Sequence, residues 1–241
     1  MKTDVIFKSE TMKSTDFRFD SKVVKVFDDM VVRSVPFYPE FQRMIAEIVR
    51  TYAQPETSIY DLGCSTGATL LALDPVIDPS LKFVGIDELD EMLGKCKTNL
   101  EANGVSHKFD LLNFDLNKTV CIENASVVIL CLTLQFIRPL NRMKLLESVY
   151  KQLKEGGIVI LVEKVLGEAT ESNRQFIKYY YDFKRRNNYD ELEIAIKREA
   201  LENILVPYKV SENIKMLEEA HFHSNEVFFK WYNFAGFVGI K

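Results

Sequence analysis

The stretch YDLGCSTGAT, residues 60–69, ends an apolar run, turns at small residues and then begins a short apolar helix. Its centre is the pattern G-x-S-x-G, formed by Gly63, Ser65 and Gly67. Glycine at such a turn adopts backbone angles that other residues avoid, and it lets a ligand approach the main chain. The G-x-G-x-x-G pattern of NAD enzymes needs a central glycine and a later third glycine. The stretch therefore favours a ligand without a pyrophosphate over a dinucleotide.

The same pattern also occurs in the nucleophile elbow of serine hydrolases, in which Ser65 would attack the substrate. An elbow needs a histidine and an acid placed around the nucleophile, and it follows a later strand than the first. Of the 3 histidines, His221 and His223 come after all the core strands. We therefore reject a hydrolase triad, and we expect these two histidines in a surface loop rather than at a metal site.

Short β-branched runs alternate with segments of helical periodicity through the middle of the chain. The runs predict strands at 58–63, 82–87, 108–114, 126–133 and 158–164. Most are apolar on both faces, as in a parallel sheet covered by helices. Helices are expected at 39–52, 89–104 and 141–157. This alternation predicts a doubly wound α/β sheet.

The C-terminal segment 225–241 holds two strand-like runs around Asn233, too close together for a helix between them. Such strands must pair antiparallel. The sheet is therefore expected to be mostly parallel and seven-stranded, with an antiparallel C-terminal strand. Two segments are additions to this single domain of 1–241, namely an N-terminal lid segment, 1–38, and a helical insertion, 165–210.

The insertion contains two helical stretches, and the second opens with a capping box of Asp190 and Glu193. The basic run KRRNN, 184–188, is expected to be a solvated helix end, with contact to RNA or to a second anionic substrate as the alternative. The aromatic cluster at 179–183 is expected to pack internally, although it could instead form a pocket wall or a dimer seam.

The composition, 47% hydrophobic and 27% charged, is that of an ordinary globular chain. The net charge of −4 argues against a dedicated nucleic-acid binder, so no direct nucleic-acid contact is expected. No apolar run is long enough to span a membrane, and the charged N-terminus leads us to expect no signal peptide. The 4 cysteines have neither metal-binding nor disulfide spacing, which indicates a cytoplasmic protein without a metal.

Two acidic residues follow the second and third predicted strands. Asp87 lies 24 residues after Gly63 (87 − 63), close to the spacing of about 20 for the acid that binds ribose hydroxyls. Asp115 can accept the exocyclic amine of adenine, with the backbone of Leu116 beside it. Either carboxylate alone is more often a helix cap. Together with the glycine turn they predict an adenosine ligand without phosphates, and S-adenosylmethionine fits best.

Longer motifs extend over nearly the whole chain, from about Phe7 to Lys241. They are RSVP (33–36), YDLGCS (60–65), ENAS (123–126), TLQF (133–136) and the stretch from Tyr189 to Asn203. In these motifs the chain resembles the carboxy-S-adenosyl-L-methionine synthases, a family with the Rossmann-like class I methyltransferase fold. The resemblance implies an enzyme that converts S-adenosyl-L-methionine and prephenate into carboxy-S-adenosyl-L-methionine and phenylpyruvate.

The resemblance also implies a homodimer whose product supplies a tRNA carboxymethyltransferase, which makes 5-oxyacetyl uridine at the wobble position. Carried over by motif, the ligand-binding residues are Tyr38, Gly63, Cys64, Ser65, Asp87, Glu88, Asp115, Leu116, Cys131 and Arg198. Positions 88 and 131 depart from the family pattern, which has Asn at both. A main-chain contact is therefore expected at Glu88, and the thiol of Cys131 is a weaker donor than an amide.

Arg198 is the residue that the resemblance assigns to catalysis. The methyl group of a sulfonium is weakly acidic, and loss of a proton gives an ylide that can attack carbon dioxide released from prephenate. Arg198 offers a planar, bidentate partner for the carboxylate that this attack forms. Helical spacing alone favours a different role, an i,i+4 ion pair with Glu202.

Two other functions stay open at this point. The chain could be an ordinary small-molecule methyltransferase that uses S-adenosylmethionine, or a non-catalytic adenosylmethionine-binding partner in a tRNA-modifying complex. Arg198 separates the synthase from the methyltransferase. The binding residues do not separate the catalyst from the binding partner.

Overall fold

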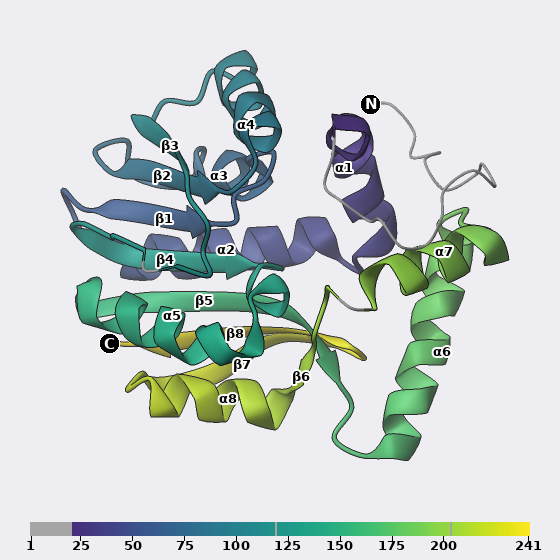
Figure 1. Cartoon of the computed structure of the whole chain (residues 1–241). Helices are drawn as coiled ribbons and strands as arrows, with labels where there is room; N and C mark the ends of the chain where they lie inside the picture. Colours follow the sequence, from purple (N-terminus) through teal and green to yellow (C-terminus); the bar gives the residue numbers. More distant parts are fainter. Residues whose placement is uncertain (1–20, 119, 203) are drawn as a thin grey trace.

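The computed structural model describes residues 21–118, 120–202 and 204–241. Figure 1 shows one twisted sheet with helices against both faces. The strands are β1 (Ser58–Leu62), β2 (Lys82–Asp87), β3 (Phe109–Asn113), β4 (Ala125–Cys131), β5 (Leu153–Leu166), β6 (Tyr208–Lys209), β7 (His223–Trp231) and β8 (Phe234–Ile240). The helices are α1 (Ser21–Ser34), α2 (Tyr38–Tyr52), α3 (Ala68–Leu73), α4 (Asp90–Ala102), η2 (Leu134–Phe136), α5 (Pro139–Gln152), α6 (Thr170–Arg186), α7 (Glu191–Leu201) and α8 (Val210–Glu219). Residues 1–20 of the predicted lid lie outside the described part of the chain.

Seven strands lie in the order β3-β2-β1-β4-β5-β8-β7. The strands from β3 to β5 are parallel, and β8 runs antiparallel to both of its neighbours, β5 and β7. The short β6 pairs with β5 in addition. The predicted sheet, mostly parallel with an antiparallel C-terminal strand, is therefore confirmed. The strand order reverses between β1 and β4, and open parallel sheets bind ligands at the carboxyl ends of the strands beside such a reversal.

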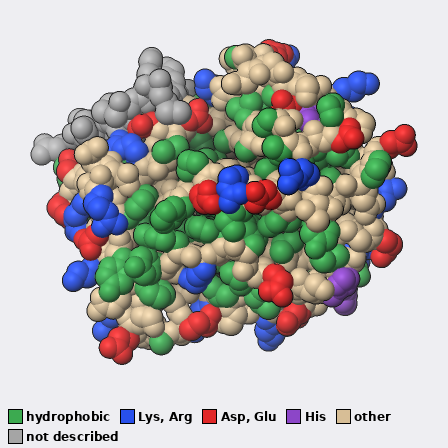
Figure 2. Space-filling model, turned by 180° about the vertical axis from the view of Figure 1, so that it is seen from behind, with side chains coloured by type: hydrophobic (Ala, Val, Ile, Leu, Met, Phe, Trp, Pro, Cys, Tyr) green, Lys and Arg blue, Asp and Glu red, His purple; other side chains and the backbone are tan. Residues whose placement is uncertain are grey.

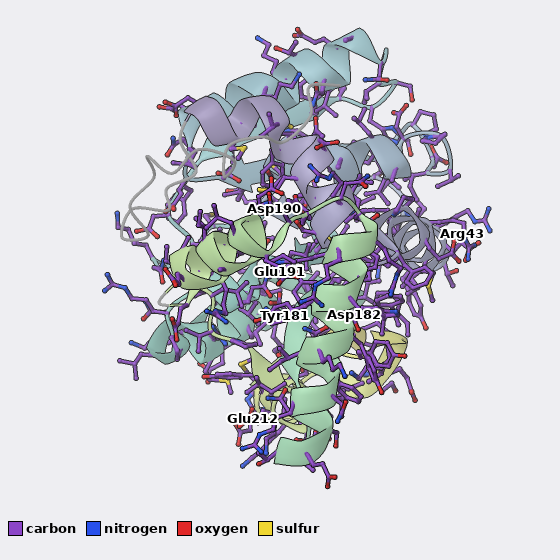
Figure 3. All side chains as sticks on the ribbon, turned by 90° about the vertical axis from the view of Figure 1, so that its right-hand side faces the viewer. Arg43, Tyr181, Asp182, Asp190, Glu191 and Glu212 are labelled. Atoms are coloured by element: carbon purple, nitrogen blue, oxygen red, sulfur yellow. The ribbon has the colours of Figure 1, made fainter. Side chains whose placement is uncertain are left out.

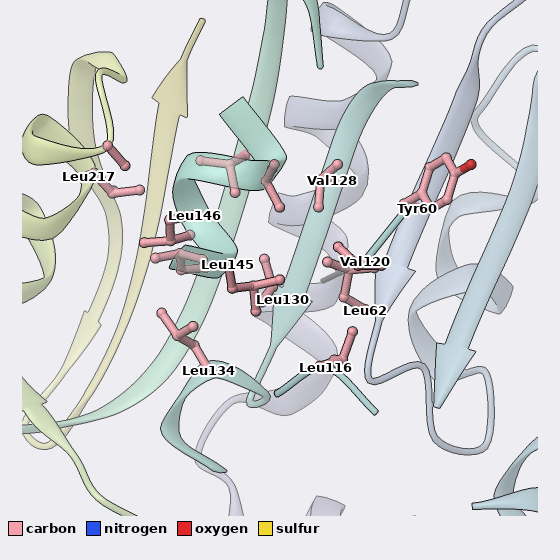
Figure 4. Close-up of a cluster of buried hydrophobic side chains, with 14 of the residues drawn as sticks. Tyr60, Leu62, Leu116, Val120, Val128, Leu130, Leu134, Leu145, Leu146 and Leu217 are labelled. Atoms are coloured by element: carbon pink, nitrogen blue, oxygen red, sulfur yellow. The ribbon is translucent and has the colours of Figure 1, made fainter. Parts of the chain in front are cut away.

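Alternate residues of the central strands enter two separate cores. Figure 4 shows part of the first, in which Val128 and Leu130 of β4 belong to the same buried cluster as Leu145 and Leu146 of α5. The second core lies on the other face, where α2, α3 and α4 cover the sheet; it contains Ile59 of β1. Both faces of β1, β2 and β4 are almost entirely buried, which explains their mostly apolar sequences, whereas the edge strand β3 is partly exposed.

The second core continues into polar residues at the carboxyl edge of the sheet. Asp61 of β1, Cys131 of β4 and Lys164 of β5 each stand two residues after a buried member of this core. Because side chains on a strand alternate between faces, all three point to the α2 side of the sheet. Adjacent parallel strands therefore place an acid, a thiol and a lysine side by side.

The predicted insertion forms α6 and α7, which lie with α1 beyond the carboxyl edge of the sheet (Figure 1). The predicted capping box is present, since Asp190 accepts the N–H of Glu193 at 2.8 Å and Glu193 accepts that of Asp190 at 2.9 Å. Helix α8 has no counterpart in the sequence prediction. Within the ranges that the structure describes, every helix is too short or too polar to cross a membrane.

Candidate functional site

The glycine turn lies between the ends of β1 and β2. The N–H groups of Gly63 and Cys64 donate to the carbonyl of Ile86 at 2.7 and 2.9 Å. The N–H of Ser65 donates to Oδ2 of Asp87 at 3.0 Å. The end of the second strand therefore fixes the turn that follows the first, so the predicted ribose acid and the predicted glycine turn meet.

Only glycine fits at position 63. Its φ is 81°, and a Cβ added there would lie 2.4 Å from Oγ1 of Thr133. Ser65 also has a positive φ, 50°, which is an uncommon conformation for a residue with a side chain. Such conformations persist where the surrounding structure enforces them, and they concentrate at ligand sites.

A cavity of about 420 Å³ opens at the carboxyl edge of the sheet, within the size range of small-molecule sites. Its wall contains residues of α1, the glycine turn, the ends of β2 and β5, η2, α6 and α7. Nine of the ten predicted ligand-binding residues line it, namely Tyr38, Gly63, Cys64, Ser65, Asp87, Glu88, Leu116, Cys131 and Arg198. Segments far apart in the sequence are thus brought together at one site.

Asp115 is the predicted residue that does not line the cavity. Its Oδ1 accepts the N–H of Asn117 at 2.9 Å, and its carboxylate pairs with Lys118 at 3.5 Å. Its neighbours Phe114 and Leu116 do line the cavity. The segment after β3 is therefore in place beside the cavity, while the Asp115 carboxylate is turned toward its own loop.

The cavity has an acidic end, where Asp87 and Glu88 line it at the end of β2 and the buried Asp61 of β1 lies close behind. Asp61, which the sequence analysis did not single out, is 1% exposed, and neither carboxylate oxygen has a hydrogen-bond partner among the described residues. Burial, followed by the charge of Asp87, raises the pKa of Asp61 to about 7. Burial also raises the pKa values of Asp87 and Glu88. An acid inside an otherwise apolar strand was the signal that could have identified Asp61.

Cys131 and Tyr38 form the wall next to Asp61. Burial, followed by the charge of Asp61, raises the pKa of the Cys131 thiol. The thiol accepts a contact from Nε2 of Gln42 at 3.5 Å, and Oε1 of Gln42 has no partner among the described residues. Burial likewise raises the pKa of Tyr38. Cys131, Tyr38 and Gln42 are neutral at pH 7, so the chargeable groups at this end are Asp61, Asp87 and Glu88.

A basic end lies opposite, at β5, α6 and α7. Lys164, Lys184, Lys197 and Arg198 all line the cavity, and only Arg198 was predicted. Lys184 is 5% exposed, so the prediction that the run 184–188 is solvated is wrong at its first residue. Burial, followed by the charges of Lys164 and Lys197, lowers the pKa of Lys184 to about 7. A lysine at the end of the predicted strand 158–164, as Lys164 is, was a usable signal of a cavity residue.

Arg198 lies on α7 with its side chain exposed, at the mouth of the cavity that it helps to line. The alternative ion pair with Glu202 does not form, since no ion pair or hydrogen bond joins these two described residues. Lys197, the residue before it, is buried and donates from Nζ to the hydroxyl of Tyr189 at 2.6 Å. Arg198 is therefore anchored through its neighbour, while its guanidinium stays available to a ligand.

Helix α1, which belongs to the predicted lid segment, forms one side of the cavity. Thr66, in the glycine turn, donates from its hydroxyl to Oδ1 of Asp28 at 2.6 Å. Arg33 donates to the carbonyls of Asn187 and Asn188 at 2.9 and 2.8 Å, in the loop between α6 and α7. One helix thus connects the glycine turn with the helical insertion.

The described residues contain no group of three or more His, Cys, Asp or Glu side chains that could hold a metal ion. The polar groups that line the cavity are carboxyl groups, lysines, hydroxyls, amides and one arginine. They suit an organic ligand that carries both positive and negative charge.

A family model described as a methyltransferase domain matches residues 59–157. The carboxy-S-adenosyl-L-methionine synthase of Methylococcus capsulatus is 53% identical over 242 residues, which cover 100% of this chain and 100% of that protein. The carboxy-S-adenosyl-L-methionine synthase of Desulfotalea psychrophila is 42% identical over 241 residues, covering 100% of this chain and 98% of the relative.

Solved methyltransferases share the fold at low sequence identity. An O-methyltransferase family 2 protein of Planctomyces limnophilus superimposes with a TM-score of 0.66 at 17% identity, over 97% of this chain and 63% of its own. Human N-acetylserotonin methyltransferase superimposes with a TM-score of 0.63 at 16% identity, over 91% of this chain and 55% of its own. These two likenesses establish the α/β methyltransferase fold alone.

Proposed function

Because the chain belongs to the carboxy-S-adenosyl-L-methionine synthase family, we propose that it converts S-adenosyl-L-methionine and prephenate into carboxy-S-adenosyl-L-methionine and phenylpyruvate. The observation that carries this proposal is the charge separation along one cavity. Asp87 and Glu88 line one end, and the buried Asp61 lies close behind Asp87. Lysines and Arg198 line the other end, where Glu202 is the one acid among the described lining residues. A cationic adenosyl sulfonium and an anionic carboxyl donor fit these two ends.

At the acidic end, the backbone of Gly63, Cys64 and Ser65 approaches the ligand, and Asp87 accepts the ribose hydroxyls. Leu116 contacts the adenine through its main chain, and Asp115 reaches the exocyclic amine if its side chain turns from Asn117. Asp61 offers negative charge to the positive groups of the ligand. It has no internal partner, and an unpartnered buried acid beside a cavity is a recurring feature of functional sites.

Cys64, Cys131 and Tyr38 have supporting roles in this proposal. Cys64 is 4% exposed, and its Sγ packs so closely on Gly85 that a Cβ added to that glycine would lie 2.9 Å away. The side chain therefore points into the core, and only the main chain of Cys64 would face the ligand. Cys131 and Tyr38 are half-buried in the cavity wall and would exclude water from the sulfonium. Exclusion of water strengthens every electrostatic contact inside the site.

The chemistry transfers one carboxyl group. Prephenate loses carbon dioxide and its ring hydroxyl as it becomes aromatic, and the departing hydroxide takes one proton from the sulfonium methyl group to form water. The resulting ylide carbon bonds to the carbon dioxide, which gives the carboxymethyl sulfonium. Arg198 then pairs with the new carboxylate through its planar guanidinium. No protein base is needed for this proton balance.

The mass of the nucleoside that co-purifies with the protein tests the proposal. Carboxy-S-adenosyl-L-methionine, heavier than S-adenosyl-L-methionine by one carbon dioxide, supports it. S-adenosyl-L-homocysteine alone, together with no phenylpyruvate after incubation with prephenate, favours an ordinary methyltransferase. Carboxylated ligand without any turnover of prephenate favours a non-catalytic binding partner.

We also propose a homodimer that acts in the cytoplasm and supplies a tRNA carboxymethyltransferase. Figure 2 shows hydrophobic side chains gathered in a band across one face, with charges of both signs around it and no continuous basic area on that face. Tyr179 and Tyr232 are each 40% exposed, and their rings pack together at 4.8 Å. These surfaces support association with protein rather than direct binding of RNA. Sedimentation analysis of the purified protein tests the dimer.

A further inference from the structure

Two lysines of the basic end come from separate elements and approach the same aromatic ring. Lys164 lies near the end of β5, and Lys184 lies in the last turn of α6. Their Nζ atoms are 5.1 and 4.7 Å from the centroid of the Tyr180 ring. Both lysines and Tyr180 line the cavity. The sheet and the insertion therefore each contribute one ammonium group beside the Tyr180 ring.

Two acids of the insertion, Asp182 and Glu191, already form ion pairs. Arg185 pairs with Asp182 at 2.6 Å and with Glu191 at 2.5 Å. Figure 3 labels Asp182 on α6 and Glu191 at the start of α7. These two carboxylates neutralise Arg185, the exposed residue that follows Lys184 in the sequence. Lys184 itself faces the cavity and does not pair with either of these described residues.

The two buried acids nearby are engaged as well. Glu163, on the opposite face of β5 from Lys164, accepts the N–H groups of Leu134 and Gln135 at 3.0 and 2.8 Å. Glu193 caps α7. Within residues 21–118, 120–202 and 204–241, no carboxylate lies within ion-pair distance of Lys164 or Lys184.

An unpaired ammonium group in a mostly buried position is unfavourable because it has left water without gaining a counter-charge. Burial lowers the pKa values of Lys164 and Lys184. The ring of Tyr180 compensates in part, since cations are attracted to aromatic faces. An anion that enters the cavity would supply the missing counter-charge and restore the protonated form of both lysines.

We propose that Lys164 and Lys184 bind the carboxylate that the second substrate keeps, so that this substrate is recognised as a dicarboxylate. The inference rests on the proposed function, which places the sulfonium at the acidic end and the transferred carboxyl group beside Arg198. A carboxyl donor with two carboxylates then needs a second cationic position, farther from the sulfonium. The lysine pair beside Tyr180 supplies it, and it gives the site a preference for dianions over monoanions.

The test measures binding of prephenate and of phenylpyruvate to protein loaded with S-adenosyl-L-homocysteine, which has no methyl group to react. Titration calorimetry compares the wild type with Lys184→Met, Lys164→Met and the control Lys178→Met. Lys178 is exposed on the same helix and outside the cavity. Methionine keeps the length and apolar contacts of the side chain while it removes the charge.

We expect either cavity variant to weaken both ligands about tenfold or more, since a charge-assisted hydrogen bond to a buried partner is lost. Phenylpyruvate shares the effect because it retains the carboxylate in question. The affinity for S-adenosyl-L-homocysteine changes by less than about twofold, and the control binds all three ligands as the wild type does. Lys184→Arg, which keeps the charge, recovers part of the loss.

Wild-type affinity for prephenate in both cavity variants overturns the inference, as does a wild type that binds neither carboxylate. These outcomes are distinguishable from failure of the proposed function. That failure is a wild type that makes no carboxylated product, whereas the lysine inference fails when product forms and the KM for prephenate is unchanged in both variants.

Discussion

Oδ2 of Asp87 accepts the N–H of Ser65 at 3.0 Å, which joins the end of β2 to the turn that follows β1. Oδ1 of the same carboxylate accepts the N–H of Leu89 at 3.1 Å, at the start of α4. One side chain therefore fixes the main chain on both sides of the proposed ribose site. The Asp87 carboxylate would accept the ribose hydroxyls, and it also holds the turn that would contact the rest of the ligand. Ligand binding and the conformation of the turn therefore depend on the same side chain.

Asp87→Asn is expected to weaken binding of S-adenosyl-L-homocysteine by about 10- to 100-fold, because one charged acceptor becomes a donor that faces the N–H of Ser65 or Leu89. Calorimetry measures the change. Asp110→Asn is the matched control, since Asp110 is exposed on β3 and pairs with Lys82 away from the cavity. Equal affinity in Asp87→Asn and the control would contradict the assignment of Asp87.

Gly63→Ala is expected to lower the free energy of unfolding by about 1–3 kcal/mol, from the combined cost of a positive φ and of a contact with Thr133. The contact is severe, since the added Cβ would meet Oγ1 of Thr133 at 2.4 Å. Urea denaturation measures the loss. Gly94→Ala on the exposed side of α4 meets no atom within 4 Å, so it should stabilise by about 0.5–1 kcal/mol. An unchanged free energy of unfolding in Gly63→Ala would mean that the turn is not constrained as described.

The sheet and the glycine turn were predictable because their signals are local. The core strands are short, mostly apolar runs, and the turn has glycine at two of its positions with positive φ, Gly63 and Gly67. The predicted boundaries differ from the observed ones by a few residues; β5, for example, starts at Leu153 rather than at 158. Nine of the predicted ligand-binding positions also line the cavity. Seven of them lie at or just after the ends of strands that a parallel sheet places at one edge, whereas Tyr38 begins α2 and Arg198 lies in α7.

The basic end was not predictable in the same way, because burial of a lysine is decided by elements far apart in the sequence. Lys184 belongs to a charged run that is typical of a solvated helix end, but in the fold it is 5% exposed and lies near Lys164 of β5 and Lys197 of α7. Helix α8 was missed for a related reason. Its inward face, with Met216 and Leu217 buried, is too short a pattern to separate from a loop. Asp61 was overlooked because its strand, buried throughout, predicts core packing, although the one acid inside it is the exception that could have been noticed.

Arg198→Ala is expected to weaken binding of carboxy-S-adenosyl-L-methionine by about 30-fold, or about 2 kcal/mol. This is the lower part of the range for loss of a charge-paired group, because the side chain is exposed before the ligand binds. Affinity for S-adenosyl-L-methionine should stay within about twofold, since that ligand has no carboxylate on its one-carbon arm. Competition binding with both ligands measures the difference. The exposed Arg186 supplies the control variant Arg186→Ala, and an equal loss for both ligands would assign Arg198 to general stability instead.

Lys184→Met is expected to stabilise the ligand-free protein while it impairs the site. The folded-state pKa of Lys184 is lowered to about 7 from the usual lysine value of 10.5, so the unfolded chain binds more protons between these two pH values. The cost of the buried charge is therefore complete below about pH 7 and disappears as pH rises toward 10.5. Lys164 and Lys197 face the same position and add to this cost, whereas the Tyr180 ring reduces it.

The stability gain of Lys184→Met should accordingly be about 1–3 kcal/mol at pH 6.5 and should shrink steadily by pH 9.5. Urea denaturation at several pH values measures the difference in the free energy of unfolding between wild type and variant. Groups that titrate in both proteins cancel in this difference. Saturating prephenate with S-adenosyl-L-homocysteine should reverse the order, because the bound carboxylate stabilises only the protein that keeps the lysine. A gain that is independent of pH would show that Met simply packs better there, and that Lys184 carries no unfavourable buried charge in the absence of its ligand.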